Sequence, residues 1–125
     1  MRSYNRTFLI GNCAAEPVLA ETKNGKNYMY FPLAVERGYK NPETESNEVD
    51  FHRIVQWGEV SEKLLPMVKK GTRLFITGKM LNYKYEGATE TKYITEIHAT
   101  QIEVLSFNQS IDKKTTTKEK ELVNA

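Results

Sequence analysis

Residues 48–71 read EVDFHRIVQWGEVSEKLLPMVKKG, a strand pattern followed directly by a helix pattern. Polar and apolar side chains alternate over 48–57, which predicts a β-strand with two distinct faces. Over 59–70 the apolar residues recur at helical spacing, which predicts one stripe on a helix. The residues of this stripe are Val60, Leu64, Leu65 and Val68. Pro66 weakens the helix near its end, and Gly71 is expected to stop it.

Two more strand patterns precede this stretch. Residues 4–15 and 27–37 are rich in aromatic and β-branched side chains, and a bent extension is expected at 18–22. The pair Asn24-Gly25 predicts a tight hairpin turn between the extension at 18–22 and the strand at 27–37, because both residues readily adopt the positive φ that such turns require.

Three irregular features are expected along the chain. Pro32 has no backbone N–H, so an edge or a bulge is expected there. Residues 38–47 are polar and are expected to form a long loop with a functional role. The apolar alternation changes phase between Ala99 and Ile102, which predicts a bulge.

Two strand patterns follow the helix, at 72–84 and 92–105, with a turn at 85–91. The order of three strands, one helix and two strands predicts the OB fold, a five-stranded all-β Greek-key barrel with its helix between strands 3 and 4. Small SH3-like barrels and half-sandwiches compete with this interpretation. The folded domain is expected over 1–105. Residues 106–125 are rich in Lys, Thr and Glu and are expected to be a flexible, disordered C-terminal tail.

The formal net charge is only +2, but the charge is unevenly distributed. Seven basic and two acidic residues lie between Lys63 and Lys92, whereas residues 1–62 hold seven basic and nine acidic ones. A basic stripe of this kind is typical of a groove that follows a polyanion, although a solubilising surface would give the same counts.

The chain has a single cysteine, Cys13, so it cannot form an internal disulfide, as is usual in a reducing compartment. No stretch approaches the roughly 20 apolar residues of a membrane span, and no secretory signal pattern is visible. These features favour a cytoplasmic protein without a membrane partner.

Residue patterns of catalytic and metal sites are missing from the sequence. Cys13, His52 and His98 are far apart and have no metal-ligand spacing, so no metal and no cofactor are expected. The glycines are isolated, and the carboxylates of 43–50 lie beside no nucleophile or base. We therefore expect a protein that is not an enzyme, with a hydrolase as the most distant alternative.

Aromatic residues occur beside basic ones where the predicted strands meet loops. They are Tyr39-Lys40, Phe51-His52-Arg53, Trp57 and Tyr83-Lys84-Tyr85. An aromatic ring can stack on any base, at about 1–3 kcal/mol per base, while Lys and Arg neutralise the phosphates. Taken alone, Phe51 fits a core position better, whereas Tyr39 and Tyr85 stand in polar loops. The whole pattern predicts binding of single-stranded DNA with little sequence preference.

Six short motifs, in order and with short gaps, resemble those of the bacterial single-stranded DNA-binding protein family over most of residues 5–105. They are NRTFLIGN at 5–12, Pro17 with Asn24-Gly25, LAV at 33–35, FHRIVQWG at 51–58, Lys70-Gly71 with ITGK at 76–79, and YITEI at 93–97. The resemblance implies a cytoplasmic, nucleoid-associated OB-fold protein that coats single strands during DNA replication, repair and recombination.

The resemblance also implies roles for individual residues. Base stacking is expected at Tyr39, Phe51, Trp57 and Tyr85. Phosphate contacts are expected at Arg6, Lys40, Arg53, Lys69, Lys70, Arg73, Lys79, Lys84 and Lys92. His52 matches a position that supports subunit association in the family, usually as a homotetramer.

The sequence departs from the family pattern in three places. Ala20-Glu21 replace a frequent Arg-Tyr pair, and Glu59 replaces a frequent lysine, so positive charge is lost at both positions. The chain ends in KEKELVNA at 118–125 rather than in an acidic Pro-Phe tip, so recruitment of replication proteins through the tail is not implied. Accessory, plasmid and phage versions remain open. So does a second hypothesis, an OB-fold protein-interaction module of the primosome type.

Overall fold

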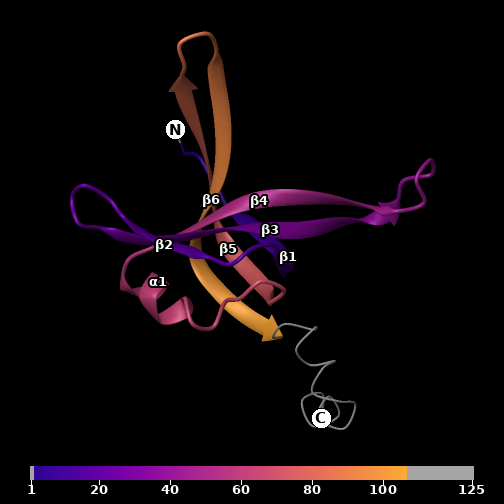
Figure 1. Cartoon of the computed structure of the whole chain (residues 1–125), viewed down its shortest axis with the longest axis horizontal. Coiled ribbons are helices and arrows are strands. Elements are labelled where there is room, and N and C mark those ends of the chain that lie inside the picture. Colours follow the sequence, from indigo (N-terminus) through magenta and orange to yellow (C-terminus); the bar gives the residue numbers. More distant parts are fainter. Residues whose placement is uncertain (1, 107–125) are drawn as a thin grey trace, which may run out of the picture.

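The computed structural model describes residues 2–106 of the 125-residue chain. It contains six strands and one helix in the order β1 (Thr7–Cys13), β2 (Val18–Glu21), β3 (Asn27–Lys40), β4 (Asn47–Trp57), α1 (Glu59–Leu64), β5 (Arg73–Glu86) and β6 (Thr91–Ser106) (Figure 1). The expected tail falls outside the described residues, except for Ser106, which ends β6.

Five of the strands pair in a closed circuit, in the order β1–β5–β6–β4–β3 and back to β1. Every pairing in the circuit is antiparallel except β4–β6, which is parallel. In chain order the helix lies between β4 and β5, the third and fourth of these five strands, so the predicted OB architecture is confirmed. The expected extension at 18–22 is a separate short strand, β2, that pairs only with β3.

The core forms because alternate residues of each barrel strand point inward. Met29, Phe31 and Leu33 of β3 are all buried, and Phe31 is only 1% exposed. They pack in one cluster with inward residues of the other strands, namely Ile54, Leu74, Ile76 and Ile97. The residues between them point outward and are free to form a binding surface.

The helix is shorter than the spacing of apolar residues predicts. It ends at Leu64 rather than near Lys70, because Pro66 cannot donate the next helical hydrogen bond and its ring clashes with the preceding turn. Val68 is still fully buried, whereas Val60 is 51% exposed. The predicted apolar stripe is therefore wrong at Val60, and α1 covers the core through Leu64 and the segment after it.

Two hairpins project from the barrel as long two-stranded arms, one formed by β3 and β4 and the other by β5 and β6 (Figure 1). Strand pairing continues to Lys40 in the first arm, so the expected 38–47 loop shrinks to residues 41–46. Arg37 forms a bidentate ion pair with Asp50 across this arm, at 2.8 and 2.9 Å. The hydrogen bonds from the guanidinium lower the pKa of the Asp50 carboxyl.

The backbones of β5 and β6 approach each other closely near Gly78. The register skips Thr100, because Thr77 pairs with Gln101 and Gly78 with Ala99, which confirms the predicted bulge. A Cβ on Gly78 would overlap the carbonyl oxygen of His98. Glycine is thus the residue that allows the two backbones to approach at this corner.

Pro32 lies where β3 changes its neighbour. Residues 27–30 pair with β2, and residues 33–34 pair with β1. The Pro32 carbonyl accepts the Ala14 N–H on this side at 2.8 Å, while its register with β4 is unbroken. The expected irregularity is therefore an interruption of one ladder, without a bulge.

The single thiol is inaccessible. Cys13 is 1% exposed and donates to the Ala15 carbonyl at 2.9 Å, and burial raises its pKa to about 11. Because the thiolate is the reactive form, the folded protein is expected to resist a maleimide at pH 8, whereas the protein in 6–8 M urea should react fully. Mass spectrometry after timed labelling measures this, and rapid labelling without urea would contradict the described burial.

Candidate nucleic-acid interface

The outward positions of β3, β4, β6 and β5 carry aromatic rings on all four strands. Each of these aromatic residues either lies between two inward-pointing residues of its strand or continues the same inward–outward alternation along an arm. We call this surface the aromatic face. Its rings belong to Tyr28 and Tyr30 of β3, Phe51 and Trp57 of β4, His98 of β6, and Tyr83 and Tyr85 of β5.

Five of these rings form a continuous row across the strands. The centroid of the Trp57 ring lies 4.9 Å from that of Tyr28, and the Tyr28 centroid lies 6.0 Å from that of Tyr30. On its other side the Trp57 ring is 6.1 Å from His98, which is 6.0 Å from Tyr83. Such separations are typical of interacting rings. Trp57 remains 38% exposed, so the row presents a ring surface to solvent.

Phe51 lies beside this row and is 66% exposed. The interpretation of Phe51 as a core residue is therefore wrong, because its position on β4 points outward while Ile54 supplies the core contact. Phe51 lines an apolar groove of about 450 Å³ together with Tyr30, Pro32 and Arg53. A ring at the edge of an apolar groove is suited to contact a flat apolar ligand such as a base.

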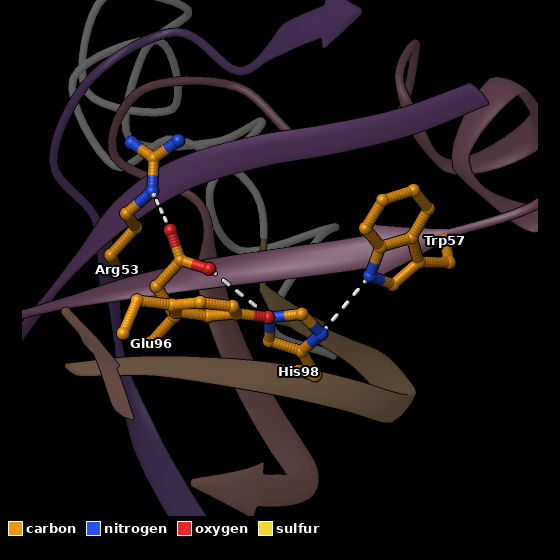
Figure 2. A network of polar contacts seen from close by, with 5 residues as sticks. Arg53, Trp57, Glu96 and His98 are labelled. Atoms are coloured by element: carbon orange, nitrogen blue, oxygen red, sulfur yellow. Dashed lines mark hydrogen bonds and ion pairs between the residues drawn. The ribbon is translucent and has the colours of Figure 1, made fainter. Parts of the chain in front are cut away.

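Arg53 lies within the aromatic face and contacts both an aromatic ring and a carboxylate. Its guanidinium carbon is 4.1 Å from the centroid of the Tyr30 ring, a cation–π contact. Its Nε donates to Glu96 Oε2 at 2.7 Å. Figure 2 shows the chain of polar contacts that continues from Glu96 through His98 to Trp57.

The other two expected stacking residues lie on the arms and not in loops. Tyr39 belongs to β3 and Tyr85 to β5, and both are more than half exposed. Tyr85 pairs with Lys92 across its arm, so these two side chains share one side of the arm. The strands extend further than their polar composition predicts because pairing continues into each arm, with one register shift between Glu36 and Lys40 in the β3–β4 arm.

Three of the expected phosphate contacts share the aromatic face. Arg53 is in its centre, Lys79 is the register partner of His98, and Lys92 is the partner of Tyr85. Lys92 also lies 3.8 Å from Glu90 in an exposed ion pair, which contributes little to stability. These three residues place positive charge beside the rings.

The remaining basic residues lie elsewhere. Lys84 is one residue from Tyr85 and so faces the other side of the arm, where it pairs with Glu86 at 3.3 Å. Arg73 donates to Asn12 and lines a separate cavity with Ile10 and Gly11. The others are Arg6 next to Tyr4, Lys40 at the end of β3, and Lys69 and Lys70 in the turn before β5.

His52 is half-buried and alternates with Phe51 and Arg53 along β4. It lines the Phe51 groove from the neighbouring position. The backbone N–H of Lys70 donates to the Glu16 carboxylate, and Glu16 lines the same groove. His52 and Glu16 therefore lie at the edge of the Phe51 groove, and Glu16 links this groove to the turn before β5.

Several residues of the aromatic face were not predicted as site residues. Tyr28 and Tyr30 could have been found, because they alternate with Met29 and Phe31 in a predicted strand. His98 and Glu96 could not, because their place beside Trp57 and Arg53 depends on the parallel pairing of β4 with β6.

Within residues 2–106 no group of three or more His, Cys, Asp or Glu residues is placed to hold a metal ion. In the same part of the chain, no helix combines the length and apolar character needed to cross a membrane.

The barrel and its aromatic face define an OB-fold domain with exposed aromatic rings on one surface. A sequence model of the single-strand binding protein family matches residues 4–105, and the chain belongs to this family. Single-stranded DNA-binding protein 2 of Streptococcus agalactiae is 34% identical over 102 residues, covering 82% of this chain and 77% of its own length. Single-stranded DNA-binding protein 1 of Chlorobaculum tepidum is 30% identical over 112 residues, covering 87% and 69%.

A solved structure shares the fold. The crystal structure of the small single-stranded DNA-binding protein from Streptomyces coelicolor superposes with a TM-score of 0.64 at 19% identity, over 79% of this chain and 92% of that one. At this identity the likeness supports the fold alone.

Proposed function

We propose that this protein coats single-stranded DNA with little sequence preference, by stacking bases on the aromatic face and contacting phosphates through adjacent Lys and Arg side chains. The observation that carries the proposal is the row of rings across four strands with Arg53 among them. Stacking accepts every base because every base has a π-face, so binding through the aromatic face is expected to show little sequence preference.

The stacking residues in this proposal are Phe51 and Trp57 at the barrel and Tyr39 and Tyr85 on the arms. Two arms with exposed rings extend the surface beyond the barrel, so a strand can follow it over several nucleotides. Binding of this kind serves DNA replication, repair and recombination in the bacterial cytoplasm, and it requires no catalysis.

A titration with oligo(dT) tests the proposal. Trp57 is the only tryptophan, so its fluorescence reports the aromatic face directly. Addition of oligo(dT) at low salt is expected to quench this fluorescence, and binding should weaken as salt increases through loss of counterion release. Absence of both quenching and binding at low salt would contradict the proposal.

Replacement of Arg53 with glutamine is expected to weaken binding about equally for all base sequences. It should also lower the slope of log K against log salt by about 1, because one phosphate contact is lost. The Arg73→Gln variant removes the same charge beside Asn12 and is expected to change the slope less. Fluorescence titrations at four salt concentrations measure both slopes, and an unchanged slope for Arg53→Gln would exclude this contact.

We further propose that the protein assembles as a homotetramer. Phe8 and Ile10 on β1 are both exposed, and the ring centroid of Phe8 lies 6.3 Å from that of Phe75 on β5. These side chains form an apolar patch that is open to solvent. His52 is proposed to contact a neighbouring subunit. Light scattering with and without oligo(dT) of about 70 nucleotides, long enough for several barrels at roughly 4–16 nucleotides each, measures assembly and stoichiometry. A monomer under both conditions would contradict the proposal.

A further inference from the structure

We propose that Glu96 and His98 are positioning residues that fix the Trp57 ring and the Arg53 guanidinium for nucleotide binding. The inference rests on the proposed function, because it assigns Trp57 to base stacking and Arg53 to phosphate contact. Neither Glu96 nor His98 needs to touch DNA for this role. They act through a chain of hydrogen bonds that joins a stacking ring to a phosphate-binding cation.

The parallel pairing of β4 with β6 creates this chain. Arg53 is the register partner of Glu96, and Val55 is the partner of His98. Residues two apart on a strand share a face, so Glu96 and His98 point to the same side as Arg53 and Trp57. Figure 2 shows Glu96 between Arg53 and His98, with Trp57 on the far side of the imidazole.

The direction of each hydrogen bond is fixed by chemistry. The Trp57 indole N–H can only donate, so the His98 Nδ1 that lies 3.0 Å away must be an acceptor. A neutral imidazole carries one proton, which is then on Nε2. This nitrogen lies 3.1 Å from Glu96 Oε1 and 3.3 Å from the Tyr83 hydroxyl, and the charged carboxylate is the nearer and stronger acceptor. The Glu96 carboxylate thus selects the tautomer of His98 that can hold the Trp57 ring.

The same carboxylate orients Arg53 with its other oxygen. Glu96 Oε2 accepts from the Arg53 Nε at 2.7 Å, which leaves both terminal nitrogens of the guanidinium uncommitted to Glu96. Figure 2 shows these nitrogens pointing away from the carboxylate. A guanidinium held in this way on the Tyr30 ring can still form the two-pronged contact that suits a phosphate.

Burial separates the two positioning residues from the residues they position. The side chains of Glu96 and His98 are 15% and 10% exposed, whereas that of Arg53 is 42% exposed. Trp57 is also partly exposed. The less exposed pair is therefore placed to hold the orientation of the outer pair, and a ring held before binding loses less freedom when a base stacks on it.

Two matched substitutions of His98 separate the links of the chain. In His98→Asn the side-chain oxygen can take the place of Nδ1 and accept the Trp57 N–H. In His98→Gln the side-chain nitrogen can take the place of Nε2 and donate to Glu96, but the acceptor for Trp57 is lost. The two variants differ by one methylene, so a merely structural role for His98 predicts similar behaviour.

The first readout needs no DNA. The single indole N–H gives one signal in an ¹H–¹⁵N spectrum, and its exchange with solvent is expected to be slow in the wild type and His98→Asn but fast in His98→Gln. In fluorescence titrations, His98→Gln is expected to bind oligo(dT) about three- to tenfold more weakly than His98→Asn. In a Trp57→Phe background, which keeps a ring but has no N–H and no tryptophan fluorescence, the two should bind end-labelled oligo(dT) alike when binding is followed by the fluorescence anisotropy of the label.

A third variant, at Glu96, distinguishes the positioning role from a purely electrostatic effect, because the two predict opposite changes in affinity. Glu96→Gln removes a negative charge from the aromatic face, so electrostatics alone predicts tighter binding to DNA. The proposed role predicts weaker binding by about two- to tenfold, because Arg53 and His98 donate to different oxygens of Glu96 and in Gln one of these positions is an NH₂ group that cannot accept.

The outcomes distinguish this inference from the proposed function. Equal indole exchange and equal binding for His98→Asn and His98→Gln, or tighter binding for Glu96→Gln, would overturn the positioning role while wild-type binding upholds the proposed function. Failure of the wild type to bind oligo(dT) would overturn the proposed function itself, and the inference with it.

Discussion

Replacement of Phe51 with alanine is expected to weaken binding of oligo(dT) by about 1–3 kcal/mol, which is roughly a 5- to 150-fold rise in Kd. Phe51 is 66% exposed, so the substitution removes a stacking surface without opening a cavity in the core. Fluorescence titration of Trp57 at low salt measures the change. The free energy of unfolding in urea is expected to stay within about 0.5 kcal/mol of the wild type.

Tyr93 provides a matched control for Phe51. It is 74% exposed, but it alternates with Lys92 and Ile94 and so lies on the side of its arm opposite the aromatic face. Tyr93→Ala is expected to bind oligo(dT) as the wild type does. Equal losses for Phe51→Ala and Tyr93→Ala would mean that exposed rings act without regard to face, and the assignment of the aromatic face would be wrong.

Replacement of Phe31 with alanine is expected to lower the free energy of unfolding by about 3–5 kcal/mol, the range for a phenylalanine removed from a core. Phe31 is 1% exposed and belongs to the cluster that all the barrel strands share. Domains of this size are stable by only about 5–15 kcal/mol, so the variant should lose a large part of its stability. Urea denaturation followed by circular dichroism measures it.

The same chemical change at two phenylalanines therefore has opposite expected consequences. Phe31→Ala acts on folding, and Phe51→Ala acts on binding. Where Phe31→Ala remains folded, its affinity for oligo(dT) is expected to stay near that of the wild type. A loss of stability below about 1 kcal/mol in Phe31→Ala would contradict the described core.

The barrel could be predicted because strand alternation and element order are local features of the sequence. The alternation over 27–37 and 48–57 gives the inward residues, and the position of the helix between strands gives the topology. The phase change after Ala99 also gives the bulge at Thr100. These features need no knowledge of which strands become neighbours.

Other features depend on tertiary contacts and could not be predicted. The helix pattern over 59–70 does not show where Pro66 ends the helix or that Val60 faces solvent. The polar residues of 38–47 suggest a loop, but pairing across the arm extends the strand to Lys40. Phe51 alternates like a core residue, and only the location of the core shows that its face is the outer one.

The candidate site was predictable in part for the same reason. Aromatic and basic residues adjacent in sequence could be found, so Phe51, Trp57 and Arg53 were recognised as candidates. The contacts of Glu96 and His98 depend on the parallel register between β4 and β6, which no local pattern contains.

Photo-cross-linking of oligo(dT), followed by peptide mass spectrometry, tests the central claim most directly, because it identifies the side chains that lie against bases. We expect cross-links at rings of the aromatic face, above all Phe51, Trp57 and Tyr85. Cross-links confined to exposed rings elsewhere, such as Phe8 on β1 and Tyr93 on the opposite side of its arm, would contradict it.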